Sequence, residues 1–280
     1  MPERILLIGG ASSGKTHFGA QLLGRLQHGS GTLRFRESPV NYELFQSVLQ
    51  KLGQGLSSDH TGAGVYGEVL FPVANGAGKT IDIVWPDYAG EQIENIADLR
   101  TLTSNWTERI RESTHWILMV RPMLATNAED LLNRPSSGPM RNPATAQQEG
   151  SAQHVMSKQA HTVELLQIIR HIKGINSLAR TASPKMLVLL SCWDELTQNG
   201  TSPAGLLKKR LPMLDSFLRA NWEEDALLLY GLSALGRPLS PTEVDQDYQD
   251  RGPESFGYVV TPAGSQEKDL TIPIATLALS

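Results

Sequence analysis

Short apolar runs alternate along the chain with longer segments in which apolar residues recur at helical spacing. Apolar runs bounded by turn residues are typical of strands buried in a sheet. They lie at 5–8, 67–73, 80–85, 116–120, 186–190 and 226–232. Apolar positions repeated every three or four residues predict helices that cover such a sheet. These segments lie at 16–27, 41–52, 93–110, 158–173 and 203–222, with a terminal helix from about 270.

The order of these elements predicts the fold class. Strands and helices alternate, and the later strands are rich in Ile, Leu and Val, which favours a mostly parallel sheet with helices on both faces. The NGAG turn at 75–78 predicts one antiparallel hairpin strand. We therefore predict a three-layer α/β/α fold, in a single domain over residues 1–280. The Pro-, Ser-, Asn- and Gln-rich segment 122–156 is expected to be a flexible insertion, and 240–280 a C-terminal extension.

Composition indicates which partners and which cellular compartment to expect. A net charge of −4 gives no reason to expect nucleic acid or an anionic membrane as partner. The single cysteine, Cys192, cannot form an internal disulfide, which fits a reducing compartment, so we expect a cytoplasmic protein. No apolar stretch approaches the ~20 residues that cross a bilayer, so we predict neither a membrane span nor a targeting segment.

The sequence GGASSGKT, between the first predicted strand and helix, matches the phosphate-binding pattern G-x-x-x-x-G-K-[ST] in the required context. Backbone N–H groups of such a turn surround a phosphate, and the helix N-terminus adds partial positive charge. Lys15 is expected to neutralise the β- and γ-phosphates, and the Thr16 hydroxyl to bind Mg²⁺. The alternative is a chance glycine-rich turn with a solvated lysine. The expected phosphate-binding residues are Gly9, Ala11, Ser12, Ser13, Gly14, Lys15 and Thr16.

A second candidate turn, DYAG, follows the hairpin strand at 80–85. Asp87, near a strand end beside the phosphate loop, is suited to support Mg²⁺, often through a water. The N–H of Gly90 is expected to contact the γ-phosphate and so to sense its presence. The alternative is an ordinary strand-terminating turn, because Pro, Asp and Gly are common turn residues.

Four motifs together carry a family resemblance. GASSGKT, DYAG, SCWD at 191–194 and SAL at 233–235 follow one another in the order found in translation-factor-related and Ras-like GTPases. The chain resembles that class over residues 1–239 apart from the insertion, and WPDYAGEQ with SCWD also resembles the bacterial double-GTPase group associated with conflict and antiviral loci. The resemblance implies the Ras-like P-loop fold, GTP/GDP and Mg²⁺ as cofactors, switch behaviour, and a protein effector or a second GTPase as partner.

The resemblance also assigns residues to the guanine base. The aspartate of this class accepts two hydrogen bonds from guanine, and its position matches Asp194, with Ser191 in place of a threonine. Adenine would leave that carboxylate partly unpaired, so the pocket should favour guanine. Cys192 replaces a lysine whose stem lies along the base, which predicts lower affinity and specificity. The alternative for Asp194 is a helix N-cap or a turn residue before Glu195 and Leu196. Guanine O6 is expected to accept from backbone N–H groups of Ser233, Ala234 and Leu235.

Residues for hydrolysis are expected around the γ-phosphate. Thr61 would complete the Mg²⁺ shell, although a hydroxyl in a glycine-rich loop is an equal alternative. Glu91 stands where many relatives carry a water-orienting glutamine, with Gln92 beside it. A carboxylate near the γ-phosphate is electrostatically unfavourable, which predicts slow or partner-stimulated hydrolysis. Two further functions remain open, a nucleotide-gated binding module with negligible turnover and a P-loop ATPase or kinase. Conceivable arginine fingers, which otherwise form a solvated helix face, are Arg100, Arg109 and Arg111.

Overall fold

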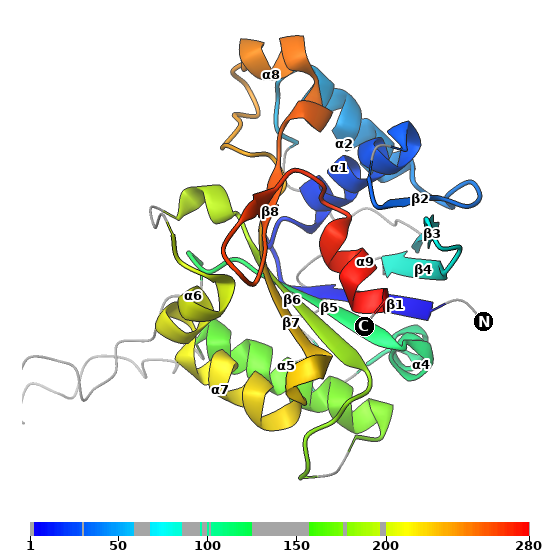
Figure 1. The fold of residues 1–280 in the computed structure, drawn as a ribbon, viewed down its shortest axis with the longest axis vertical. Helices are drawn as coiled ribbons and strands as arrows, with labels where there is room; N and C mark the ends of the chain where they lie inside the picture. Colours follow the sequence, from blue (N-terminus) through cyan, green and yellow to red (C-terminus); the bar gives the residue numbers. More distant parts are fainter. Residues whose placement is uncertain are drawn as a thin grey trace, which may run out of the picture.

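The computed structural model describes residues 3–29, 31–58, 68–85, 96, 100, 102–124, 157–175, 178–196 and 200–279. Within these ranges the strands form one nine-stranded sheet with the order β2-β3-β4-β1-β5-β6-β7-β8-β9 (Figure 1). The strands are β1 (Glu3–Gly9), β2 (Leu33–Phe35), β3 (Val69–Asn75), β4 (Thr80–Trp85), β5 (His115–Val120), β6 (Lys185–Ser191), β7 (Leu227–Ser233), β8 (Tyr258–Val260) and β9 (Gln266–Glu267).

The centre of the sheet is parallel and both of its sides are antiparallel. β1 runs parallel to β4 and β5, and β5, β6 and β7 continue in the same direction. The predicted hairpin is confirmed as β3–β4. The prediction of a single antiparallel strand is incomplete, because β2 pairs antiparallel with β3, β8 with β7, and β9 with β8. β2, β8 and β9 have only two or three residues each, too few to show an apolar run or an alternation in the sequence.

The described helices match most of the predicted ones. They are α1 (Lys15–His28), α2 (Glu43–Gly53), α4 (Ser104–Glu112), α5 (Lys158–Lys173), α6 (Pro203–Arg210), α7 (Pro212–Asn221), α8 (Gln246–Arg251) and α9 (Ile272–Leu279), with 3-10 turns η3 (Trp193–Glu195), η4 (Glu224–Ala226) and η5 (Pro253–Ser255). The single helix predicted over 203–222 is wrong. Pro212 begins a new helix, and Leu211 before it adopts φ −132 and ψ 56, outside the helical region.

Two apolar cores confirm the three-layer arrangement. Ile5 and Leu7 of β1 point to one face and pack with residues of α1, α2 and α9. Leu6 and Ile8 point to the other face and pack with residues of α4, α5, α6 and α7. This alternation along one strand, with both faces covered, explains why β1 appears in the sequence as a continuous apolar run.

The C-terminal extension packs against α1 and the turn that follows β7. The Gln21 side chain donates to the Tyr248 hydroxyl at 2.7 Å and to the carbonyl of Pro253 at 3.0 Å. Gly257, at φ 82, lies so close to the carbonyl of Ala234 that an added Cβ would sit 2.4 Å from that oxygen. The extension therefore supports both α1, which begins at the predicted phosphate loop, and the predicted base-contacting turn.

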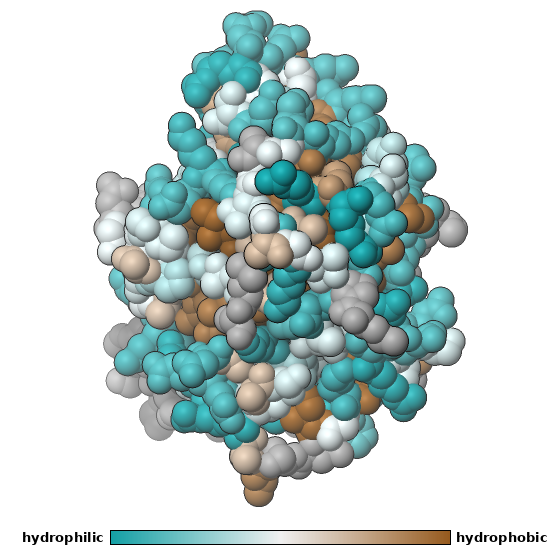
Figure 2. All heavy atoms as spheres, turned by 45° about the vertical axis from the view of Figure 1, so that its right-hand side comes forward, coloured by the Kyte–Doolittle hydropathy of each residue, from teal (hydrophilic) through white to brown (hydrophobic). Residues whose placement is uncertain are grey.

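Exposed apolar side chains are dispersed over the described surface. On the face in Figure 2, hydrophobic residues form separate small groups among hydrophilic ones. The large exposed apolar side chains in the described ranges belong to different segments, namely Val40, Met123, Leu178, Met213 and Val244. None of the described helices has the length and apolar character needed to cross a bilayer.

Candidate functional site

The turn between β1 and α1 is curled around the ammonium group of Lys15. The Lys15 Nζ donates to the carbonyl oxygens of Gly9 at 2.7 Å and Gly10 at 2.6 Å. The Ser13 hydroxyl donates to the carbonyl of Gly10 at 2.9 Å. Ser12 and Gly14 both adopt positive φ, 56 and 83, so the chain bends sharply before the helix begins. These contacts place a positive charge inside a tight backbone turn at a helix N-terminus, an arrangement suited to anions.

Two glycines of this turn are needed for different structural reasons. A Cβ on Gly9 would lie 2.8 Å from Ser13 Oγ and 3.1 Å from the carbonyl oxygen of Met119 in β5. Gly14 has room for a Cβ, but its φ of +83 favours glycine. A Cβ on Gly10 would meet nothing within 4 Å. Gly9 is thus required by packing and Gly14 by backbone conformation, whereas Gly10 is open to substitution.

The SCWD segment is fixed by a buried tryptophan. Trp193, which is 6% exposed, packs on Gly231 of β7 so closely that a Cβ there would lie 2.4 Å from its ring. The next residue, Asp194, accepts a hydrogen bond at 2.5 Å from Ser233, whose hydroxyl also accepts from the N–H of Gly236 at 2.9 Å. The structure therefore brings the SCWD and SAL motifs together. The N-cap alternative for Asp194 is wrong, because the N-cap of η3 is Cys192, whereas the turn alternative agrees with the position of Asp194 inside this 3-10 turn.

The phosphate loop and the SCWD segment also lie close together. A Cβ on Gly14 would lie 3.8 Å from Cys192 Sγ and 3.9 Å from Ser191 Cβ, so the two segments are neighbours at the carboxyl edge of the sheet. Ser191 is 2% exposed, and its hydroxyl interacts only weakly within the described part of the chain, through the adjacent Cys192 thiol. A buried hydroxyl whose partner is a thiol keeps unused hydrogen-bonding capacity, since a thiol is a weak donor and acceptor.

An arginine that the sequence analysis did not select lies at the same edge. Arg121, directly after β5, pairs with Glu195 of η3 through Nε to Oε2 at 3.0 Å and Nη2 to Oε1. Its Nη1 also donates to the carbonyl of Ser12 at 3.4 Å. The hydrogen bond to Glu195 raises the pKa of Arg121 above its usual value. Arg121 and Glu195 lie far apart in sequence, so their pairing cannot be predicted from local pattern. The local sequence shows only that an arginine directly follows a buried strand.

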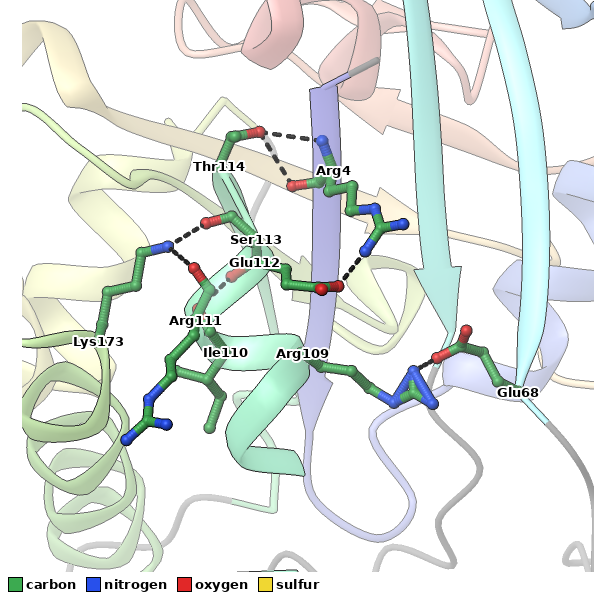
Figure 3. Close-up of polar contacts among 9 residues, drawn as sticks. All are labelled: Arg4, Glu68, Arg109, Ile110, Arg111, Glu112, Ser113, Thr114 and Lys173. Atoms are coloured by element: carbon green, nitrogen blue, oxygen red, sulfur yellow. Dashed lines mark hydrogen bonds and ion pairs between the residues drawn. The ribbon is translucent and has the colours of Figure 1, made fainter. Parts of the chain in front are cut away.

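Two of the three conceivable arginine fingers, Arg100 and Arg109, form ion pairs within the chain. Figure 3 shows Arg109 of α4 directed at Glu68, with which it forms an ion pair, while Glu112 pairs with Arg4. Arg100 pairs with Glu164 at 2.8 Å. The backbone carbonyl of Arg111 accepts from Lys173, and its side chain points away from Glu68 in Figure 3.

Several predicted site residues lie outside the described ranges, namely Thr61, Asp87, Gly90, Glu91 and Gln92. Of the three expected Mg²⁺ ligands, Thr16 alone belongs to the described part, in the first turn of α1. Among the described residues, no group of three or more His, Cys, Asp or Glu side chains is placed to hold a metal ion. The metal-binding and hydrolytic assignments therefore stay predictions.

Comparison with protein families identifies the chain. The model of the family described as Double-GTPase 1 matches residues 6–277, from β1 into α9. The chain belongs to the Double-GTPase 1 family. The predicted resemblance to the double-GTPase group is thereby confirmed.

Solved structures similar to this Double-GTPase 1 chain include two translation factors. Sup35 complexed with GDP is 10% identical, with 84% of this chain and 38% of that chain covered and a TM-score of 0.36. The bacterial selenocysteine-specific elongation factor EF-Sec is 13% identical, with coverages of 84% and 26% and a TM-score of 0.35. The chain spans less than two fifths of the length of either protein. No curated protein matches it.

The one cysteine of this Double-GTPase 1 chain gives a direct measure of the site's environment. Burial raises the pKa of the Cys192 thiol to about 11. Because only the thiolate reacts with alkylating agents, iodoacetamide should label Cys192 about two orders of magnitude more slowly at pH 8 than it labels a free thiol. The rate should rise about tenfold per pH unit toward pH 11. Labelling can be followed by mass spectrometry, and a rate that levels off near pH 9 would contradict the raised pKa.

Proposed function

We propose that this chain binds a guanine nucleotide together with Mg²⁺, hydrolyses GTP and acts as a nucleotide-dependent switch. The observation that carries the proposal is the proximity of Gly14 to the Ser191–Cys192 pair. The turn that carries the Lys15 charge therefore lies beside the SCWD segment. In that segment the carboxylate of Asp194 accepts a hydrogen bond from Ser233. Membership of the Double-GTPase 1 family supports the same assignment.

The phosphate end of the nucleotide would bind the turn of residues 9–16. Lys15 is held by two carbonyl oxygens, so its charge is already positioned before a ligand arrives. The N-terminus of α1 adds partial positive charge in the same direction. Thr16 would hold Mg²⁺ together with Asp87 and Thr61, and the bound ion would offset charge on the β- and γ-phosphate oxygens. Gly90 would contact the γ-phosphate, and Glu91 or Gln92 would orient the attacking water.

The base would bind between the SCWD and SAL segments. Asp194 would accept hydrogen bonds from the guanine N1–H and amino groups, and the N–H groups of Ser233, Ala234 and Leu235 would contact O6. The Ser191 hydroxyl, buried beside Gly14 with the weakly bonding Cys192 thiol as its neighbour, supports a polar ligand at this position. Adenine would leave the Asp194 carboxylate without its two donors, which disfavours ATP.

The same proposal includes the domain organisation, the cellular compartment and the partner of the protein. We propose a single domain over residues 1–280, working in the cytoplasm with a protein effector or a second GTPase as its partner. The resemblance of WPDYAGEQ and SCWD to double GTPases of conflict loci supports a role in a bacterial defence system. A pull-down in the GDP-bound and GTP-bound states would test the partner, because a switch should retain it in one state only.

Calorimetric titration with GDP and with ADP, each with Mg²⁺, tests the proposed ligand. We expect GDP to bind at least about a hundredfold more tightly than ADP. Equal or tighter binding of ADP would refute the base assignment and favour an ATPase or kinase. Release of phosphate from GTP, measured in a single turnover, then separates a GTPase from a binding module. Tight GTP binding with no release, with or without a partner, would favour the module.

Two glycines of the phosphate loop form a matched pair for a mutational test. Gly14→Ala forces a side chain into φ +83, at a cost of about 1–2 kcal/mol that the loop can relieve only by changing its shape. We therefore expect GDP affinity to fall by about tenfold or more. Gly10→Ala, with open space around the new methyl group, should bind GDP as the wild type does. Equal affinities for the two variants, measured by the same titration, would show that the loop conformation does not matter for binding.

A further inference from the structure

The base-reading segment of this chain has no cation of its own. Cys192 stands where the resembling GTPases carry a lysine, and its burial keeps the thiol protonated and neutral. Asp194 and Glu195, which follow in η3, both carry carboxylates. A guanine-binding segment built in this way would place negative charge near a nucleotide that is itself an anion.

Arg121 supplies positive charge next to this segment from the neighbouring strand. β5 and β6 are parallel, with Val120 opposite Leu190, so the residues directly after these two strands lie side by side. Arg121 therefore reaches η3 and donates hydrogen bonds to both carboxylate oxygens of Glu195. Its positive charge is also near enough to Cys192 to favour a thiolate there, although burial outweighs that effect.

The same guanidinium reaches the phosphate loop. Its Nη1 donates to the carbonyl of Ser12, the residue at φ 56 in the middle of the turn. One side chain thus connects the loop after β1 with the turn after β6, and Asp194 in that turn is held by Ser233 at the end of β7. The planar fork of an arginine can bind a carboxylate through two hydrogen bonds and still present a third donor, which a lysine amine cannot do with the same geometry.

We propose that Arg121 is a positioning residue that replaces, from the end of β5, the cation missing at Cys192, and that it sets the spacing between the phosphate loop and the guanine-reading turn. This inference rests on the proposed function, because the spacing matters only for a ligand that spans both segments. Arg121 and Glu195 are partly covered, with side chains 29% and 25% exposed, so their pairing is less screened by water than that of a surface pair.

The test compares GDP affinity in the full chain across four substitutions. Arg121→Ala should weaken GDP binding by about tenfold to a hundredfold, because both the bridge and its charge are lost. Glu195→Gln keeps the arginine but removes the charge that orients it, and should give a smaller loss. Arg121→Lys should fall between the wild type and Arg121→Ala. Arg219→Ala removes an arginine from a comparable ion pair on α7, with Asp215 at 2.9 Å, and should leave GDP affinity unchanged.

A rescue experiment separates replacement of the cation from a purely structural role. Cys192→Lys in the Arg121→Ala background should restore most of the lost GDP affinity, because a lysine returns to the position that the resembling GTPases use. In the wild-type background the same substitution should give no gain, since two adjacent cations repel each other. Unfolding midpoints without nucleotide should differ little among the Arg121 and Arg219 variants.

The possible results distinguish failure of the proposed function from failure of the inference about Arg121. A wild-type chain that does not bind GDP refutes the proposed function and this inference with it. A wild-type chain that binds GDP, with Arg121→Ala equally tight, overturns the inference and leaves the proposed function standing. Failure of Cys192→Lys to restore affinity to Arg121→Ala overturns the replacement of one cation by the other. If Arg121→Ala does not fold, Arg121→Lys and Glu195→Gln decide the question, and wild-type affinity in both would count against the inference.

Discussion

Replacing Lys15 with alanine should reduce the affinity of the chain for both GTP and GDP by at least about a hundredfold. The physical reason is that the Lys15 ammonium is the charged group at the centre of the phosphate loop. Two carbonyl oxygens, of Gly9 and Gly10, hold it at 2.7 Å and 2.6 Å, so its charge does not have to be ordered when a phosphate binds. The affinities can be measured by calorimetric titration at constant Mg²⁺.

A lysine elsewhere in the chain provides the control. Lys208 lies exposed in the last turn of α6, and Lys208→Ala changes the net charge by the same amount without touching the loop. It should bind both nucleotides as the wild type does. Because Lys15→Ala also leaves the two carbonyl oxygens without their donor, unfolding of the nucleotide-free variant should be recorded alongside. A folded Lys15→Ala variant that keeps its affinity within about threefold would refute phosphate binding at this turn.

Features that depend on neighbouring residues in the sequence could be predicted from it. The strand, turn and helix around Lys15 form one contiguous segment, so the glycines and the lysine mark the loop without any knowledge of the fold. The central strands are marked by short apolar runs, and the helices that cover them by apolar residues at helical spacing. The break at Pro212 is also a local signal, because a proline cannot continue the hydrogen bonding of a preceding helix, although the apolar spacing runs unbroken across it.

Features that depend on contacts across the sheet could not be predicted in this way. The pairing of Arg121 with Glu195 requires β5 and β6 to lie side by side in register, which no local pattern reveals. The support that Gly257 gives to Ala234 likewise depends on β8 adding to the sheet next to β7. The proximity of SCWD and SAL was expected only because a family resemblance placed both motifs near one base.

Asp194→Asn should invert the base preference of the chain. A carboxylate accepts hydrogen bonds from both guanine donors, whereas a carboxamide turns an N–H group toward one of them. Loss of one hydrogen bond, together with loss of the charge on the acceptor of the other, corresponds to a fall in GDP affinity on the order of a thousandfold. Xanthine carries a carbonyl oxygen in place of the guanine amino group, so the same carboxamide can donate to it. We expect the variant to bind xanthosine diphosphate more tightly than GDP, as measured by competition with a fluorescent nucleotide.

The structure provides two controls that make this result specific to the base. Ser233→Ala removes the donor that holds Asp194 at 2.5 Å but keeps the carboxylate, so GDP affinity should fall by only about tenfold, with no gain for xanthine. Asp225→Asn neutralises an exposed carboxylate in η4 and should change neither affinity. Asp194→Asn can still accept from Ser233 through its amide oxygen, so the turn should keep its shape. A folded Asp194→Asn variant that still prefers GDP would show that another residue reads the base.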